Sequence, residues 1–161
     1  MMETKLEELI GEAFRKHNLT LATAESCTAG LIAHRITNVP GSSDYFLGGI
    51  VAYADTTKMR LLGVSQETLD RHGAVSEEIA RQMAEGACRA LDADIGLSVT
   101  GIAGPGGGTD EKPVGLTFIG VSGPRGTRLQ RHVWDGDREA NKARSATAAL
   151  GMLSAYLEEL R

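Results

Sequence analysis

Residues Ala22 to Gly30 read Ala-Thr-Ala-Glu-Ser-Cys-Thr-Ala-Gly, and the rest of the chain is organised around this stretch. Small, apolar and β-branched residues fill positions 19–24 and predict a buried strand, whereas Leu31, Ile32 and Ile36 follow at helical spacing. A strand that turns directly into a helix directs backbone N–H groups and the positive end of the helix dipole at one place. A serine there, Ser26, is a candidate nucleophile; the alternative is that Ser26 or Thr28 only caps the helix.

The composition bounds the class of protein. The chain has 161 residues, of which 42% are hydrophobic and 24% charged, so we expect one globular domain over residues 1–161. A net charge of −4 gives no support for nucleic-acid binding. No apolar run approaches the ~20 residues of a membrane helix, and the first residues lack the apolar core of a signal peptide. We therefore expect a cytoplasmic protein with neither nucleic acid nor a membrane as partner.

The order of the elements predicts the fold. Helical patterns cover residues 3–17, 28–37, 54–62, 65–71, 76–90 and 137–160, and strand patterns cover 19–24, 48–53, 95–100, 114–122 and 127–134. The turn Pro124-Arg125-Gly126 predicts that the last two strands form an antiparallel hairpin. Helices and strands alternate before that hairpin. The expected fold is therefore an α/β fold, a three-layer α/β/α sandwich with a mixed, mostly parallel sheet.

Three segments follow the ends of strands and carry polar side chains. Ligands of open α/β sheets gather where such ends meet, so Ser26, Tyr53, Lys58 and Thr100 are candidates for one crevice. The loop 101–113 is rich in glycine, which lets a backbone approach a ligand closely; a flexible connection is the equal alternative.

Two residues are ambiguous on sequence alone. Lys58 is either a solvated surface lysine or a desolvated base, with a pKa lowered by burial near the helix terminus and Arg138. Cys27 is either a small core residue or a rival nucleophile, because a helix N-terminus lowers the pKa of a thiol. Arg138, near the start of the last helix, either clamps a phosphate or lies in solvent.

Metal chemistry has no support in the sequence. The four histidines and two cysteines are scattered, and none stands at the spacing of metal ligands. We expect neither a metal nor a cofactor.

Several motifs together resemble one family. They are Ala24–Gly30, Pro40–Ser43, Tyr53 with Lys58, Leu62–Val64, His72–Ser76, Thr100–Pro105 and Lys112–Gly115. In this order, over nearly the whole chain, they resemble the CinA C-terminal domain family. One position departs from the family pattern: Ala29 stands where a glycine is usual.

The resemblance implies an amidohydrolase that converts nicotinamide mononucleotide and water to nicotinic acid mononucleotide and ammonia, in pyridine nucleotide salvage. It implies Ser26 as nucleophile, Lys58 as its base and Thr100 as an assisting hydroxyl. The residues expected to bind the nucleotide are Glu25, Cys27, Thr28, Gly30, Tyr53, Gly101, Gly104, Gly106 and Arg138. The resemblance also implies a homo-oligomer. The alternative is a non-catalytic family member that binds a nucleotide or a partner.

Overall fold

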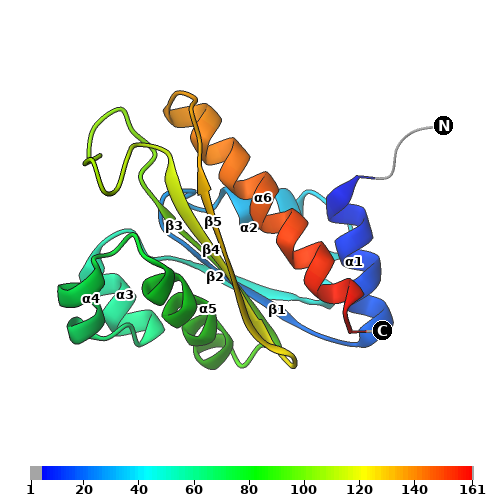
Figure 1. The fold of residues 1–161 in the computed structure, drawn as a ribbon. Helices are drawn as coiled ribbons and strands as arrows, with labels where there is room; N and C mark the ends of the chain where they lie inside the picture. Colours follow the sequence, from blue (N-terminus) through cyan, green and yellow to red (C-terminus); the bar gives the residue numbers. More distant parts are fainter. Residues whose placement is uncertain (1–4, 161) are drawn as a thin grey trace.

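A five-stranded sheet lies between two layers of helices in the computed structural model, which describes residues 5–160 (Figure 1). The α/β sandwich predicted from the sequence is confirmed. Strands β1 (Leu21–Glu25), β2 (Phe46–Val51), β3 (Ile95–Gly101), β4 (Leu116–Gly123) and β5 (Gly126–Val133) lie in the order β2-β1-β3-β4-β5. β1 pairs in parallel with β2 and β3, and β4 pairs antiparallel with β3 and β5. β4 alone therefore runs against the others.

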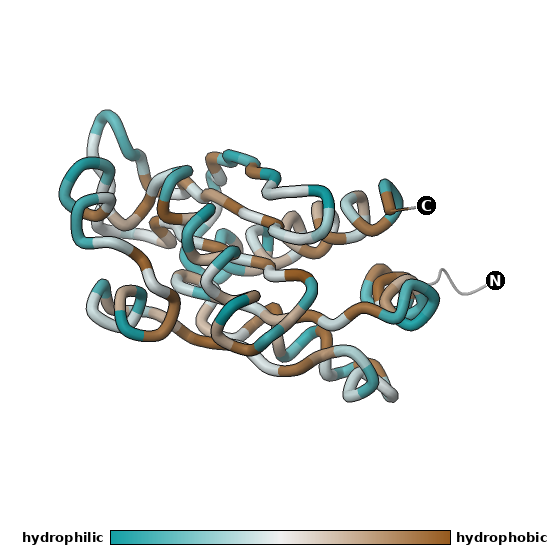
Figure 2. The backbone as a smooth tube through the Cα atoms, turned by 90° about the horizontal axis from the view of Figure 1, so that it is seen from below, coloured by the Kyte–Doolittle hydropathy of each residue, from teal (hydrophilic) through white to brown (hydrophobic). Residues whose placement is uncertain are grey.

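Two hydrophobic cores lie on opposite faces of the sheet. One face is covered by α1 (Leu6–His17), α2 (Leu31–Thr37) and α6 (Arg138–Glu158). The other is covered by α3 (Asp55–Leu62), α4 (Gln66–His72) and α5 (Glu77–Leu91). A short 3-10 helix, η1, spans Ser42–Asp44. Hydrophobic and hydrophilic residues alternate along the helices in Figure 2, as expected for surface helices with one buried side.

The strand ends place the site. Because β1, β2 and β3 run in the same direction, their carboxyl ends meet at one edge of the sheet. The turn after β1, the start of α3 after β2, and the glycine loop after β3 all begin at this edge. The late hairpin turns at Pro124 and Arg125, as predicted.

The helix after Ser26 starts later than the sequence suggested. The helical pattern was expected from Thr28, but α2 begins at Leu31, and the residues between β1 and α2 form a turn. Ala29 and Gly30 have φ angles of 50° and 97°, outside the helical region. The other boundaries shift by a few residues: β2 ends at Val51, so Tyr53 follows the strand. Glu3 of the expected first helix lies outside the described residues.

Candidate active site

A cavity of about 200 Å³ opens at the carboxyl ends of the parallel strands. It joins most of the predicted site residues: Ser26, Cys27, Tyr53, Lys58, Thr100, Gly101 and Arg138. The sequence reasoning did not select the remaining lining residues, which are Asp55, Ala74, Val75 and Ala103. Asp55 stands three residues before Lys58, a spacing that would have marked it as an ion-pair partner.

The Ser26 turn holds the serine at the edge of the cavity. The N–H of Ser26 donates to the carbonyl of Val99 at 2.9 Å, which continues the pairing of β1 with β3. The N–H of Ala29 donates to the carbonyl of Ser26 at 3.1 Å. Within residues 5–160, the N–H groups of Cys27, Thr28 and Gly30 have no acceptor. They are free to stabilise an anion beside Ser26.

Glu25 occupies the start of α2. Its two carboxylate oxygens accept from the N–H groups of Ile32 at 2.9 Å and Ala33 at 3.1 Å, and the side chain is buried. The expected effect of the helix dipole on Ser26 is therefore wrong, because a carboxylate already meets the positive end of the helix. Neither Ser26 nor Thr28 caps α2, whose N-cap is Gly30. Glu25 does not line the cavity; its carboxylate holds the start of α2 through these two hydrogen bonds.

Lys58 is buried at the floor of the cavity, with only 1% of its surface exposed. Its Nζ donates to the carbonyl of Tyr53 at 3.2 Å and lies 3.8 Å from the carboxylate of Asp55. Burial lowers the pKa of Lys58, against the opposing charge of Asp55. The direction and the main cause, desolvation by burial, agree with the expected base, whereas the expected contribution of Arg138 is absent and Asp55 is the charge that acts on Lys58.

Thr100 lies in β3 beside the cavity. Its hydroxyl donates to the carbonyl of Ala74 at 2.8 Å, and the residue is buried. Because its proton is used there, the Oγ1 lone pairs are left to accept from a neighbouring donor. Thr100 can therefore orient a protonated amine or an amide N–H inside the cavity.

Cys27 behaves as a buried thiol. Burial raises its pKa to about 11, opposite to the lowering expected at a helix N-terminus. Few molecules would carry a thiolate at neutral pH, which disfavours Cys27 as nucleophile. Gly101 lies close by: a Cβ there would stand 3.1 Å from the Cys27 sulfur and 2.8 Å from Thr117 Oγ1. Because Gly101 has no side chain, its backbone can line the cavity close to these two atoms.

Arg138 ties three segments together at the rim. One guanidinium nitrogen donates to the carbonyl of Gly104 at 2.6 Å and another to the hydroxyl of Tyr53 at 3.2 Å. Tyr53 is 62% exposed. Gly104 contributes a carbonyl without lining the cavity, and Gly106 lies exposed in the loop with open space around it. The glycine loop therefore meets the site only at its base.

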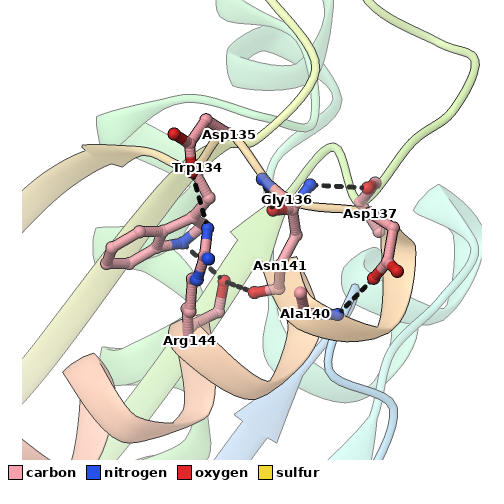
Figure 3. Close-up of polar contacts among 9 residues, drawn as sticks. Trp134, Asp135, Gly136, Asp137, Ala140, Asn141 and Arg144 are labelled. Carbon is pink, nitrogen blue, oxygen red and sulfur yellow. Dashed lines mark hydrogen bonds and ion pairs between the residues drawn. The ribbon is translucent and has the colours of Figure 1, made fainter.

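The start of α6 is fixed by its own hydrogen bonds (Figure 3). Asp137 caps the helix by accepting from the N–H of Ala140 at 2.8 Å. Asn141 accepts from the N–H of Gly136 at 2.9 Å and donates to the carbonyl of Ala103 at 3.0 Å. Arg144 pairs with Asp135 on the outside of the helix. The contacts of Asp137 and Asn141 anchor Arg138 relative to the cavity.

Thr28 and Gly30 do not reach this cavity. They line a neighbouring hollow of about 460 Å³, and its lining residues are Thr28, Ala29, Gly30, Leu31, His34, Glu139 and Lys142. We call this space the Lys142 hollow. The sequence reasoning missed it because His34 and Lys142 come from helices whose relative positions no local pattern gives.

Residues 5–160 contain no cluster of three or more His, Cys, Asp or Glu side chains placed to hold a metal ion. No helix among them is long and apolar enough to cross a membrane.

The fold and the cavity define an α/β protein with a serine and a buried lysine at the carboxyl ends of its parallel strands. The sequence profile of the CinA C-terminal domain matches residues 3–157, and the chain belongs to that family.

Relatives of the chain carry names from the same family. It is 51% identical over 148 residues to a putative competence-damage inducible protein of Moorella thermoacetica, a match that covers 92% of this chain and 36% of that protein. A protein of the same description from Clostridioides difficile is 46% identical, over 98% of this chain and 38% of its own. The chain thus spans little more than a third of these relatives.

Solved structures match over their full length. The competence/damage inducible protein CihA from Agrobacterium tumefaciens has a TM-score of 0.88 and 40% identity, covering 98% of each chain. The competence damage-inducible protein A from Klebsiella pneumoniae has a TM-score of 0.92 and 32% identity, covering 98% of this chain and 100% of that one.

Proposed function

We propose that this chain is an amidohydrolase that deamidates nicotinamide mononucleotide to nicotinic acid mononucleotide and ammonia, in pyridine nucleotide salvage. The observation that carries the reaction type is the buried Lys58 in the same cavity as Ser26. The nucleotide specificity rests on the resemblance of the motifs. A buried amine with a lowered pKa beside a hydroxyl supplies a base and a nucleophile without further groups.

In the proposed reaction, neutral Lys58 takes the proton of Ser26 as Oγ attacks the carboxamide carbon. Negative charge develops on the carboxamide oxygen, where the free N–H groups of Cys27 and Thr28 can stabilise it. The Lys58 ammonium then gives its proton to the amide nitrogen, the C–N bond breaks, and ammonia leaves an ester on Ser26.

Hydrolysis of the ester repeats these steps with water. Lys58 takes a proton from the attacking water, and the second tetrahedral intermediate collapses to the carboxylic acid. Ser26 leaves and recovers a proton from the Lys58 ammonium, so that the enzyme returns to its starting state. The acid product loses its proton to solvent.

Two polar neighbours, the carbonyl of Tyr53 and the hydroxyl of Thr100, position Lys58 for these proton transfers. In the free protein Nζ donates to the carbonyl of Tyr53, so substrate binding must turn it toward Ser26. Thr100 Oγ1 can accept from the Lys58 ammonium while its own proton stays on the carbonyl of Ala74. We assign Thr100 this orienting role, and Tyr53 and Arg138 the rim of the substrate site.

Ammonia release by the purified chain tests the proposal. Nicotinamide mononucleotide is compared with NAD and with free nicotinamide, and the acid product is identified by mass spectrometry. We expect turnover of the mononucleotide and none of free nicotinamide, because binding of the ribose and phosphate positions the carboxamide. Tight binding of the mononucleotide without ammonia release would favour the non-catalytic alternative.

A further inference from the structure

The cavity at Ser26 is too small for a whole nucleotide. Its volume of about 200 Å³ falls below the ~300 Å³ at which ligand pockets of proteins usually begin. If the carboxamide lies at Ser26, as the proposed function requires, the ribose and its phosphate must extend into adjoining space. The Lys142 hollow, about 460 Å³, is the larger of the two spaces.

The cavity and the hollow are lined by consecutive parts of the same two segments. Ser26 and Cys27 line the cavity, and the residues directly after them, Thr28 to Leu31, line the hollow. On the opposite side, Arg138 lines the cavity and Lys142 lines the hollow. Residues four positions apart on a helix lie on one face, so α6 presents both cations along the same path.

Lys142 is half-buried, and within residues 5–160 it has no carboxylate within ion-pair distance. His34 of α2 also lines the hollow as a second potential donor, and Glu139 is the one carboxylate in the lining. Arg138, by contrast, already donates to Gly104 and Tyr53. Lys142, the cation without an ion-pair partner in the described residues, thus lies one helical turn after Arg138, the arginine considered for phosphate binding from the sequence.

Thr28 supplies a second, independent sign of a ligand. Its hydroxyl is buried and has no hydrogen-bond partner in the described part of the chain, although Thr28 lines the hollow. A buried hydroxyl without a partner destabilises a free protein, so its presence calls for an explanation. Rotation about the Cα–Cβ bond would turn it toward a ligand, and the free N–H group of Gly30 belongs to the same turn.

We infer that the Lys142 hollow binds the phosphate of the nucleotide, and more generally a phosphomonoester of a ribose. The inference rests on the proposed function for the direction in which the substrate extends. Lysine binds phosphate as a point charge, and backbone N–H groups complete such sites. The carboxylate of Glu139 at the rim would favour a ribose hydroxyl over a second anionic group.

Two measurements with matched variants test this assignment. Calorimetry compares the binding of ribose 5-phosphate and of ribose to the wild type, Lys142→Met and Arg144→Met. Arg144 is the control, because it is a cation of the same helix that pairs with Asp135 outside the hollow. Ammonia release then gives the ratio of kcat/KM for nicotinamide mononucleotide over nicotinamide riboside in the same variants.

We expect Lys142→Met to weaken ribose 5-phosphate binding by about 10- to 100-fold and to lower the kcat/KM ratio by a similar factor. Arg144→Met should leave both near wild type. If the protein binds ribose 5-phosphate in a way that depends on Lys142 but releases no ammonia, the proposed function is overturned. The assignment of the Lys142 hollow as a phosphate site is then supported. Turnover with an unchanged ratio in Lys142→Met, or equal ribose 5-phosphate binding in wild type and Lys142→Met, would overturn the hollow. So would a wild type that does not bind ribose 5-phosphate.

Thr28→Val separates binding from folding, because valine keeps the shape and removes only the hydroxyl. We expect the midpoint of thermal unfolding of the free protein to hold or rise, since an unpaired buried hydroxyl is lost. Ribose 5-phosphate binding should weaken severalfold. Unchanged binding would remove the Thr28 hydroxyl from the site.

Discussion

Lys58 is the residue whose environment departs furthest from its usual one. A charged ammonium is poorly solvated in the cavity, and burial lowers its pKa. An unperturbed lysine, with a pKa of ~10.4, would be almost wholly protonated at neutral pH. Burial therefore turns a common surface cation into a candidate base, and the folded protein is least stable where Lys58 must be charged, below its lowered pKa.

We predict that turnover rises with pH through an ionisation below the pKa of free lysine. Lys58→Arg keeps a cation that cannot lose its proton, so it should be as inactive as Lys58→Met. Lys58→Met should also unfold at a higher temperature at neutral pH, because it removes a buried charge. pH–rate profiles and thermal unfolding measure these effects. Substantial activity in Lys58→Arg would contradict the role of Lys58 as base and make the residue an electrostatic clamp.

Ala29 is the second informative residue, because it has a φ of 50°, in the left-handed region. A Cβ is unfavourable there, so Ala29→Gly should raise the free energy of unfolding by about 1 kcal/mol. For a domain of this size that corresponds to roughly 2–4 °C in Tm. Ala143→Gly, at an exposed position of α6, is the matched control and should lose about 1 kcal/mol. A lower Tm for Ala29→Gly would show that the turn is not strained.

At the scale of elements, the β1–turn–α2 unit depends on Glu25. The Glu25 carboxylate, at the end of β1, accepts the first N–H groups of α2, and the N–H groups of Cys27, Thr28 and Gly30 in the turn stay unused. The sequence predicted the strand and the helix because both have strong hydrophobic patterns. It did not predict the helix start, because Thr28 resembles a cap and the contact from Glu25 spans seven residues.

Glu25→Gln tests this arrangement. One amide oxygen can still accept an N–H from α2, but the NH₂ group would face the second N–H without an acceptor. We expect a loss of about 1–3 kcal/mol in the free energy of unfolding, measured by urea denaturation. Glu77→Gln, in the exposed first turn of α5, should change stability by less than about 0.5 kcal/mol. Equal effects of the two substitutions would contradict the role of Glu25.

For the whole molecule, the strand order decides which predicted residues meet. Ser26, Lys58 and Thr100 share a cavity because β1 lies between β2 and β3, and no local pattern specifies that order. The motifs at the strand ends were enough to identify these three residues as candidates for one site. Composition left the glycine loop open between a ligand loop and a flexible connection, and the resemblance assigned it to the nucleotide. Gly104 has a packing reason instead: a Cβ there would stand 2.5 Å from Val114 Cγ1.

Self-association stays a prediction, and the edge strand β2 is where we expect it. β2 contains no charged residue, whereas the opposite edge, β5, carries Arg128 and Arg131. Charges on an edge strand prevent pairing with another chain. Val51 in β2 and Val133 in β5 are both 48% exposed, which makes them a matched pair. Val51→Lys should shift the protein toward monomer in sedimentation equilibrium, and Val133→Lys should not. A wild type that is monomeric at all concentrations would contradict the prediction.

The central claim is that Ser26 makes and breaks the bonds. Ser26→Ala is compared with Ser42→Ala, a serine of equal exposure, 8%, in η1. Ammonia release from nicotinamide mononucleotide should fall by about a thousandfold or more in Ser26→Ala, with mononucleotide binding retained, and should stay near wild type in Ser42→Ala. A Ser26→Ala protein that keeps more than a few per cent of the wild-type rate would contradict the account.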